Sequence, residues 1–169
     1  VGLLCLPLLL FMPACNKPPQ PNQSLQVRAD DPAMSARTID VLFSDSGKIQ
    51  ARLVSPLMNR YRGEDSYLDF PKGFKVFIYD SVQQVSTTIT GDRGKRNENS
   101  RIMEAWGHVV VRNEKKGEQI DTEHLVWEES RHRIWTDVPV KITRPDQVLY
   151  GDRMESNEAF TRYTIDRVR

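Results

Sequence analysis

The sequence AWGHVVVRNEKKGEQIDTEHL at residues 105–125 is followed by a related sequence, IWTDVPVKITRPDQVLYGDRM at residues 134–154, at an offset of 29 positions. Superposition at this offset pairs Trp106 with Trp135, Val109 with Val138, Val111 with Val140, Thr122 with Gly151, Glu123 with Asp152 and Leu125 with Met154. Self-similarity at a fixed period is typical of stacked repeats, in which no unit can bury its apolar face alone. We therefore expect function along a surface rather than at one catalytic point.

Each unit has the pattern of two strands around a turn. Apolar and polar side chains alternate in residues 107–113, turn-forming residues follow at 114–117, and the alternation resumes over residues 119–127. Residues 134–143 place an apolar stripe on one face, interrupted only by Thr136, and Pro139 inside this strand indicates an edge or a bulge. Each strand is thus expected to have one apolar face and one polar face.

The same alternation continues on both sides of the doubled unit. It predicts strands at residues 38–43, 49–53, 74–79, 85–90, 102–106 and 160–168, with the sequence GDRG at residues 91–94 as a hairpin loop. We count roughly nine or ten strands and find no apolar stripe of helical period. The sequence therefore predicts an all-β, antiparallel fold for a single domain at residues 36–169.

The N-terminal residues differ in composition from the predicted domain. Residues 1–15 are apolar and end in Ala14-Cys15, which is typical of a signal peptide with a lipoprotein cleavage site, so Cys15 is a candidate for lipidation. The run is shorter than the ~20 residues that span a bilayer. An uncleaved anchor or an ordinary signal peptide are the alternatives. Residues 16–35 are rich in proline and amide residues, and we predict that they form a disordered tether.

Composition and motifs exclude several classes of function. A net charge of +1 leaves no large basic face for nucleic acid, and Cys5 and Cys15 both lie outside the predicted domain, so we expect no disulfide or metal framework there. Neither a nucleophile elbow nor a phosphate-binding loop is present. The isolated histidines are predicted to be surface residues: His108, His124 and His132. We therefore predict no catalytic residues, no cofactor and no enzyme activity.

The residues around the doubled unit resemble a known family. The segments that carry the resemblance are residues 102–107, 109–113, 120–123, 125–127, 134–136, 139–140 and 150–152, together with Gly117. They resemble the OstA-like repeat of lipopolysaccharide transport proteins, in particular the LptC-like periplasmic component of the lipopolysaccharide export ABC transporter, in a version that looks lipid-anchored. The resemblance implies a twisted, open β-jellyroll with an apolar groove for acyl chains. It also implies a periplasmic protein anchored to the inner membrane by its N-terminus.

The inward register of the strands gives the candidate groove residues. They are Ile39, Val41, Phe43, Val76, Ile78, Val109, Val111, Val138 and Val140. An acyl chain that crosses water needs shielding worth ~0.8 kcal/mol per methylene, which a continuous apolar trough can supply without a catalyst. The alternative for each residue is an ordinary place in a packed core.

The family resemblance also implies contacts at the two ends of the domain. The N-terminal edge would meet the membrane subunits of the transporter, and the C-terminal edge would meet the next periplasmic bridge protein. An uncapped last strand is a template for strand addition, so we predict a docking edge at Phe160, Tyr163 and Ile165. The alternative is that charged residues protect this edge from pairing.

Two further alternatives concern charge and overall function. Arg93, Lys95 and Arg96 either contact lipid phosphates at the groove mouth or keep a hairpin loop soluble. The predicted function is to receive lipopolysaccharide from the inner-membrane ABC transporter and to pass it along the groove to the next bridge protein. The alternative is an envelope lipoprotein that tethers partners through its strand edges around a filled core.

Overall fold

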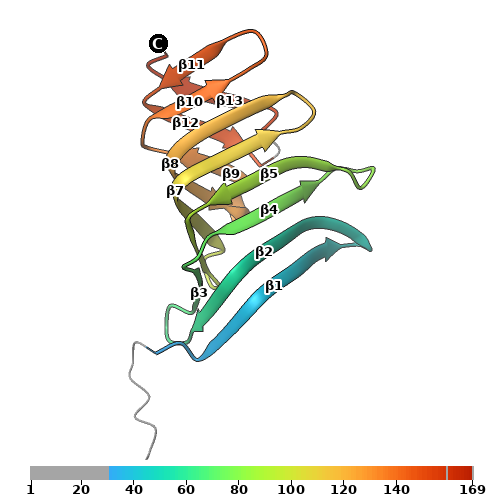
Figure 1. The fold of residues 1–169 in the computed structure, drawn as a ribbon, viewed down its shortest axis with the longest axis vertical. Coiled ribbons are helices and arrows are strands. Elements are labelled where there is room, and N and C mark those ends of the chain that lie inside the picture. Colours follow the sequence, from blue (N-terminus) through green and yellow to red (C-terminus); the bar gives the residue numbers. More distant parts are fainter. Residues whose placement is uncertain (1–30, 159, 169) are drawn as a thin grey trace, which may run out of the picture.

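The computed structural model describes residues 31–158 and 160–168. These residues form one antiparallel sheet of 13 strands that folds over into two layers (Figure 1). The strands are β1 (Met34–Asp45), β2 (Lys48–Tyr61), β3 (Tyr67–Phe70), β4 (Phe74–Tyr79), β5 (Val85–Gly91), β6 (Arg93–Asn97), β7 (Ile102–Asn113), β8 (Glu118–Glu128), β9 (Arg133–Thr136), β10 (Val140–Thr143), β11 (Val148–Gly151), β12 (Arg153–Asn157) and β13 (Tyr163–Asp166). A turn of 3-10 helix, η1 (Glu129–Arg131), joins β8 to β9. The all-β, antiparallel, jellyroll-like architecture confirms the predicted fold class.

The long strands β7 and β8 belong to both layers. The first half of β7 pairs with β6 and its second half with β5, while β8 pairs first with β10 and then with β9. We call β1, β2, β4, β5, β10, β11 and the adjoining halves of β7 and β8 the first layer. The second layer contains β3, β6, β9, β12, β13 and the other halves of β7 and β8. The end of β2 also reaches this layer, because Asn59–Tyr61 pair with β3. Figure 1 shows the first layer rising from β1 to β11, with the second layer beside it.

The chain passes between the layers along a line that we call the seam. In β7 it does so at Gly107 and His108, which both have positive φ and form a bulge in the pairing with β8. A Cβ on Gly107 would lie 2.8 Å from Oδ2 of Asp92, so only glycine fits there without displacing that carboxylate. Between β9 and β10 the chain crosses at residues 137–139. The predicted continuous strand at residues 134–143 is therefore two strands, and Pro139 marks the crossing.

The observed strand pairing corrects the register of the doubled unit. Val109 pairs with Thr122 on one side of β8, and Val140 pairs with the same Thr122 on the other side. Val140, rather than Val138, thus occupies the place equivalent to Val109. The outgoing strands are displaced by two positions from the superposition because the second hairpin is two residues shorter. The chain advances 13 positions from Val109 to its partner Thr122, but only 11 from Val140 to its partner Gly151. The return strands keep the predicted register.

The core lies between the two layers. In the first layer, cross-strand partners form what we call the aliphatic row: Val41, Leu53, Val76, Ile89, Val111, Ile120, Ile142 and Leu149. The second layer contributes Phe70, Met103, Ala105, Leu125, Trp127, Ile134 and Met154 to the same cluster. Aliphatic side chains on successive strands, many of them β-branched, pack against their cross-strand neighbours. This packing stabilises a sheet that is buried on one face.

The sheet has free edges at both ends of the stack. Within the described residues, β1 pairs with β2 alone, β11 with β10 alone and β13 with β12 alone. The first strand begins at Met34 and so includes two residues that the sequence assigned to the tether. The predicted signal segment, Cys15 and most of the predicted tether lie outside the described residues. In the described part of the chain, no helix is long and apolar enough to cross a membrane.

Candidate lipid-binding groove

The predicted groove residues lie at different depths of the interior. Val76, Val109, Val111 and Val140 are buried in the core cluster, and Ile39 and Ile78 are half-buried against it. Val41 and Phe43 are on the edge strand β1 and remain 38% and 46% exposed. The structure therefore brings eight of the nine positions, all except Val138, to one continuous interior surface that starts at an open edge.

Val138 does not have the inward strand position that the sequence predicted. It lies between β9 and β10, is half-buried, and its backbone N–H donates to Oγ1 of Thr136 at 3.3 Å. The alternation of Val138 with Val140 suggested one strand, but the crossing of the seam interrupts that alternation. Val138 is therefore a seam residue rather than a groove residue.

Accessibility falls steeply along the aliphatic row. Val41 at the edge is 38% exposed, its partner Leu53 on β2 is 5% exposed, and the members from Val76 to Ile142 are buried. Further in, a cavity of ≈ 20 Å³ remains between Val76, Ile89, Met103 and Trp127 and their neighbours. That volume holds little more than one water molecule. The interior is thus open at the β1 end and closed by contact between the layers in the middle.

A hollow of ≈ 610 Å³ lies beside the open end of the interior. Ile39, Pro56 and Phe74 supply apolar lining, and Lys72 and Lys75, both exposed, also line it. Asp40 lines it too, but its carboxylate is paired with Arg52. An apolar wall with neighbouring cationic groups suits the junction of an acyl chain with an anionic headgroup. Lys72 and Lys75 could not be predicted from the sequence, because the hollow forms only where β1, β2 and the turn before β4 come together.

A second interior row changes from apolar to polar along the stack. This row, which we call the tip row because it adjoins the hairpin tips, consists of Phe43, Ala51, Ile78, Thr87, Asn113 and Glu118. Its first three members are apolar and exposed or half-buried, whereas Thr87, Asn113 and Glu118 are buried and polar. The two ends of the interior therefore offer different environments to a ligand.

The C-terminal end of the interior is closed by residues that the sequence placed on a docking edge. Phe160 precedes β13 and is 0% exposed, so it is a core residue and not an edge residue; the predicted last strand is shorter than expected. Tyr163 and Ile165 do lie on β13, but both are half-buried and pack against the core cluster. What β13 leaves free is its backbone edge. Burial, followed by a hydrogen bond to Glu118, raises the pKa of the Tyr163 hydroxyl.

The basic segment at residues 93–96 is not a hairpin loop. Gly91 ends β5, Asp92 is at the seam, and the basic residues form β6. Arg93 pairs with Asp69 at 3.2 Å, Arg96 pairs with Glu129 at 2.7 Å, and the ammonium group of Lys95 lies 4.1 Å from the centroid of the Tyr67 ring. The Gly-Asp-Arg-Gly sequence has turn chemistry, but the chain uses it to change layers. These cations are thus engaged in holding the second layer together.

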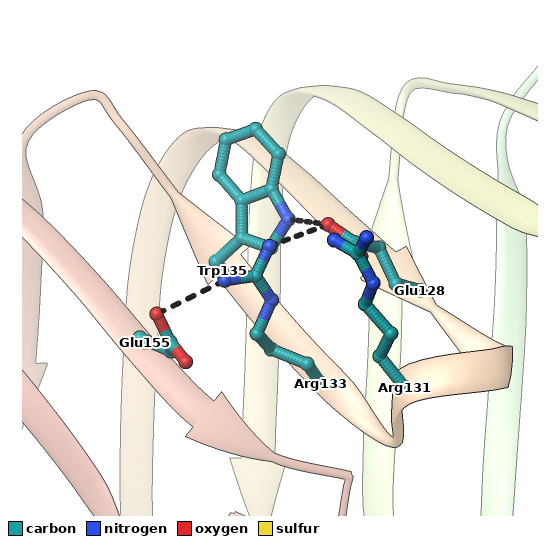
Figure 2. Close-up of polar contacts among 5 residues, drawn as sticks. All are labelled: Glu128, Arg131, Arg133, Trp135 and Glu155. Carbon is teal, nitrogen blue, oxygen red and sulfur yellow. Dashed lines mark hydrogen bonds and ion pairs between the residues drawn. The ribbon is translucent and has the colours of Figure 1, made fainter.

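The outer face of the second layer carries the network shown in Figure 2. Oε1 of Glu128 accepts hydrogen bonds from Arg133 and from the indole N–H of Trp135, each at 2.7 Å, and Oε2 accepts one from Arg131 at 3.0 Å. Arg133 reaches Glu155 on β12 at 3.4 Å. The hydrogen bonds from Arg133 and then Trp135 lower the pKa of Glu128. One carboxylate therefore holds the β8–η1–β9 turn in place.

The histidines are engaged with carboxylates. Nδ1 of His108 lies 2.6 Å from Asp92, and this hydrogen bond raises the pKa of His108. His124 stacks on Trp106 and lies between Glu104 and Asp137, and His132 contacts Glu158 at 2.9 Å. Within the described residues, no group of three or more His, Cys, Asp or Glu side chains could hold a metal ion.

The fold and the interior define a class of protein: a twisted, open β-jellyroll with an apolar interior that is accessible from one edge strand. The chain matches the family model LptC, described as lipopolysaccharide-assembly, LptC-related, over residues 2–166, and it belongs to that family. No curated protein matches the chain. Family membership confirms the resemblance seen in the sequence and assigns the protein a role in lipopolysaccharide transport in the Gram-negative envelope, on the periplasmic side of the inner membrane. This is a family of transport components and is not known for enzymes.

Proposed function

We propose that this protein carries lipopolysaccharide by its acyl chains, which enter the interior at the β1 end. It receives the lipid from the membrane subunits of the inner-membrane ABC transporter and passes it to the next periplasmic bridge protein. The observation that carries this proposal is the gradient along the aliphatic row, from exposed Val41 to fully buried Ile142. An exposed apolar surface that continues into the interior offers acyl chains a path of decreasing contact with water.

The unpaired strand edges at the two ends of the sheet support transfer in at one end and out at the other. The edge strand β1 would pair with the membrane subunits, and β11 and β13 would pair with the next bridge protein, in each case by adding a strand to an unpaired edge. Backbone pairing of this kind would align the interiors of successive domains. Lipidation of Cys15 and a tether that ends before Met34 would hold the domain near the inner membrane.

The test uses two adjacent residues of β1 that point to opposite faces. Val41 belongs to the aliphatic row, whereas Leu42 faces outward opposite Arg52 and is 56% exposed. A photo-crosslinking amino acid is placed at Phe43, with Arg112 as an outward-facing control, in cells that make lipopolysaccharide. We expect lipopolysaccharide adducts at Phe43 and none at Arg112. Val41→Glu should abolish the adducts, because a carboxylate at the entrance opposes acyl chains, while Leu42→Glu should leave them unchanged.

The packed middle of the interior supports one other function. With a cavity of only ≈ 20 Å³ between the layers, the domain also suits a tethering lipoprotein that joins partners by its strand edges around a filled core. The same experiment separates the two functions. Protein adducts alone at Phe43, or equal effects of the Val41 and Leu42 variants, would exclude lipid carriage and favour tethering.

A further inference from the structure

The two layers are joined by polar contacts at the C-terminal end of the interior. Glu118 points inward from the first layer at the end of the tip row, and Tyr163 points inward from β13 in the second layer. The Tyr163 hydroxyl donates to Oε1 of Glu118, and the guanidinium group of Arg144, which follows β10, donates to both residues. The Arg144 guanidinium also lies 5.4 Å from the centroid of the Tyr163 ring.

A second contact joins the same layers nearer to the solvent. Nζ of Lys116, at the tip of the β7–β8 hairpin, donates to the backbone carbonyl oxygens of Phe160 at 3.3 Å and Thr161 at 3.0 Å. Phe160 lies beneath this contact and is fully buried. We call Lys116, Glu118, Arg144 and Tyr163 the latch. At the β1 end, the corresponding tip-row positions, Phe43 and Ala51, are exposed and half-buried.

The latch differs physically from the rest of the interior. In the middle of the interior, the apolar side chains of the core cluster lie between the layers, whereas here a carboxylate with a 4% exposed side chain is buried beside them. Oε2 of Glu118 and Oγ1 of Thr87, in the same row, are both buried without a hydrogen-bond partner among the described residues. A buried polar atom without a partner destabilises the closed arrangement, and water or a ligand can satisfy it once the layers separate. The closed arrangement therefore carries a local cost at these two atoms that separation of the layers would relieve.

We propose that the latch holds the C-terminal end of the groove shut and that lipopolysaccharide passes this end only when Tyr163 separates from Glu118 and Arg144. This inference rests on the proposed carriage of lipopolysaccharide. In this proposal the latch residues control the passage of lipopolysaccharide. They neither bind its acyl chains nor pair β13 with a partner. Cargo would enter at β1 independently of the latch.

The experiment fixes the latch with a covalent bridge and reads lipid contact on both sides of it. In the full chain with Cys5 and Cys15 changed to Ser, Lys116→Cys and Thr161→Cys are joined by a short bismaleimide; both positions are exposed. Photo-crosslinkers at Phe43 and Leu149 report on the entrance and on the last strand of the aliphatic row. With purified lipopolysaccharide, the bridge should leave the Phe43 adduct intact and lower the Leu149 adduct by about tenfold or more.

A second experiment compares a variant that opens the latch with a matched control variant. Tyr163→Phe keeps the ring and removes the hydroxyl that joins the layers, so it should increase the Leu149 adduct. Tyr150→Phe makes the same chemical change on the outer side of β11, where the side chain is 50% exposed, and should have no effect. A Phe43 adduct with an undiminished Leu149 adduct after bridging, or equal effects of the two Tyr variants, would overturn the latch. Loss of every adduct, including that at Phe43 in the unbridged protein, would instead refute the proposed carriage of lipid.

Discussion

Glu128 ends β8 and faces outward, yet its side chain is only 10% exposed, because the residues that bind it also cover it. Its hydrogen-bond donors come from η1 and β9, so the carboxylate fixes the turn that leads into the second repeat unit (Figure 2). The sequence did not predict this role. Glu128 and Glu129 are adjacent in the sequence, but their different partners, Arg133 and Arg96, become neighbours only through the folding of the second layer.

Glu128→Gln should lower the free energy of unfolding at pH 7 by about 1–2 kcal/mol, since charge-assisted hydrogen bonds are replaced by weaker neutral ones. Because the pKa of folded Glu128 is lowered, its contribution is present above the unfolded pKa and is lost as the pH falls through the folded pKa. Urea unfolding at pH 7 and in acid should show a difference between variant and parent that shrinks on acidification.

Glu155→Gln provides the matched control for this carboxylate. Glu155 contacts the same Arg133, but at 3.4 Å and with its side chain 55% exposed. Exposed ion pairs contribute little, so its cost should be about 0.5 kcal/mol or less. Equal costs for the two variants, or a Glu128 effect that is independent of pH, would contradict the role assigned to Glu128.

At the scale of the element, hairpins were predictable and seam crossings were not. The β7–β8 hairpin follows from local alternation and from the turn at residues 114–117, both visible in the sequence. The crossing at residues 137–139 keeps the apolar alternation through Val138, so nothing local distinguishes it from a continuous strand. Phe160 was misassigned for a related reason: an aromatic residue next to a terminal strand looks like part of that strand, whereas its side chain is buried in the core cluster formed by distant strands.

Gly151, at the end of β11, sets how closely β13 approaches the first layer. A Cβ at this position would overlap Cγ2 of Ile165 and lie 3.2 Å from the carbonyl oxygen of Asp166. Gly151→Ala should therefore displace β13 and lower the free energy of unfolding by about 1–3 kcal/mol, the usual cost of overpacking. Urea denaturation of the purified domain measures this cost.

A double-mutant cycle shows whether the cost arises from Ile165. In the Ile165→Ala background the methyl group that collides with the new Cβ is gone, so Gly151→Ala should cost less than it does in the parent protein. Residues in contact show such coupling, whereas independent sites are additive. Additive effects of Gly151→Ala and Ile165→Ala would show that β11 and β13 do not meet as described.

At the scale of the whole molecule, the strands are stacked nearly in a single line, so that the stack is almost one-dimensional. Each strand pairs with its neighbours along the order from β1 to β13, with β7 and β8 in the middle joining both layers (Figure 1). The repeat in the sequence predicted this arrangement, as well as the family and the apolar interior. It did not predict that the interior is open at one end and latched at the other. That asymmetry depends on cross-strand rows whose members are scattered from Val41 to Leu149.

A one-dimensional stack should open from its ends, because terminal strands have one neighbour and central strands have two. Backbone amide hydrogen exchange in the lipid-free protein should therefore be slowest in β7 and β8 and faster in β1 and β13. Added lipopolysaccharide should slow exchange first in β1 and β2, where the aliphatic row is accessible, and should leave β7 and β8 nearly unchanged. Uniform exchange across all strands, or protection by lipid that begins at β13, would mean that the cargo does not enter where Val41 and Phe43 are exposed.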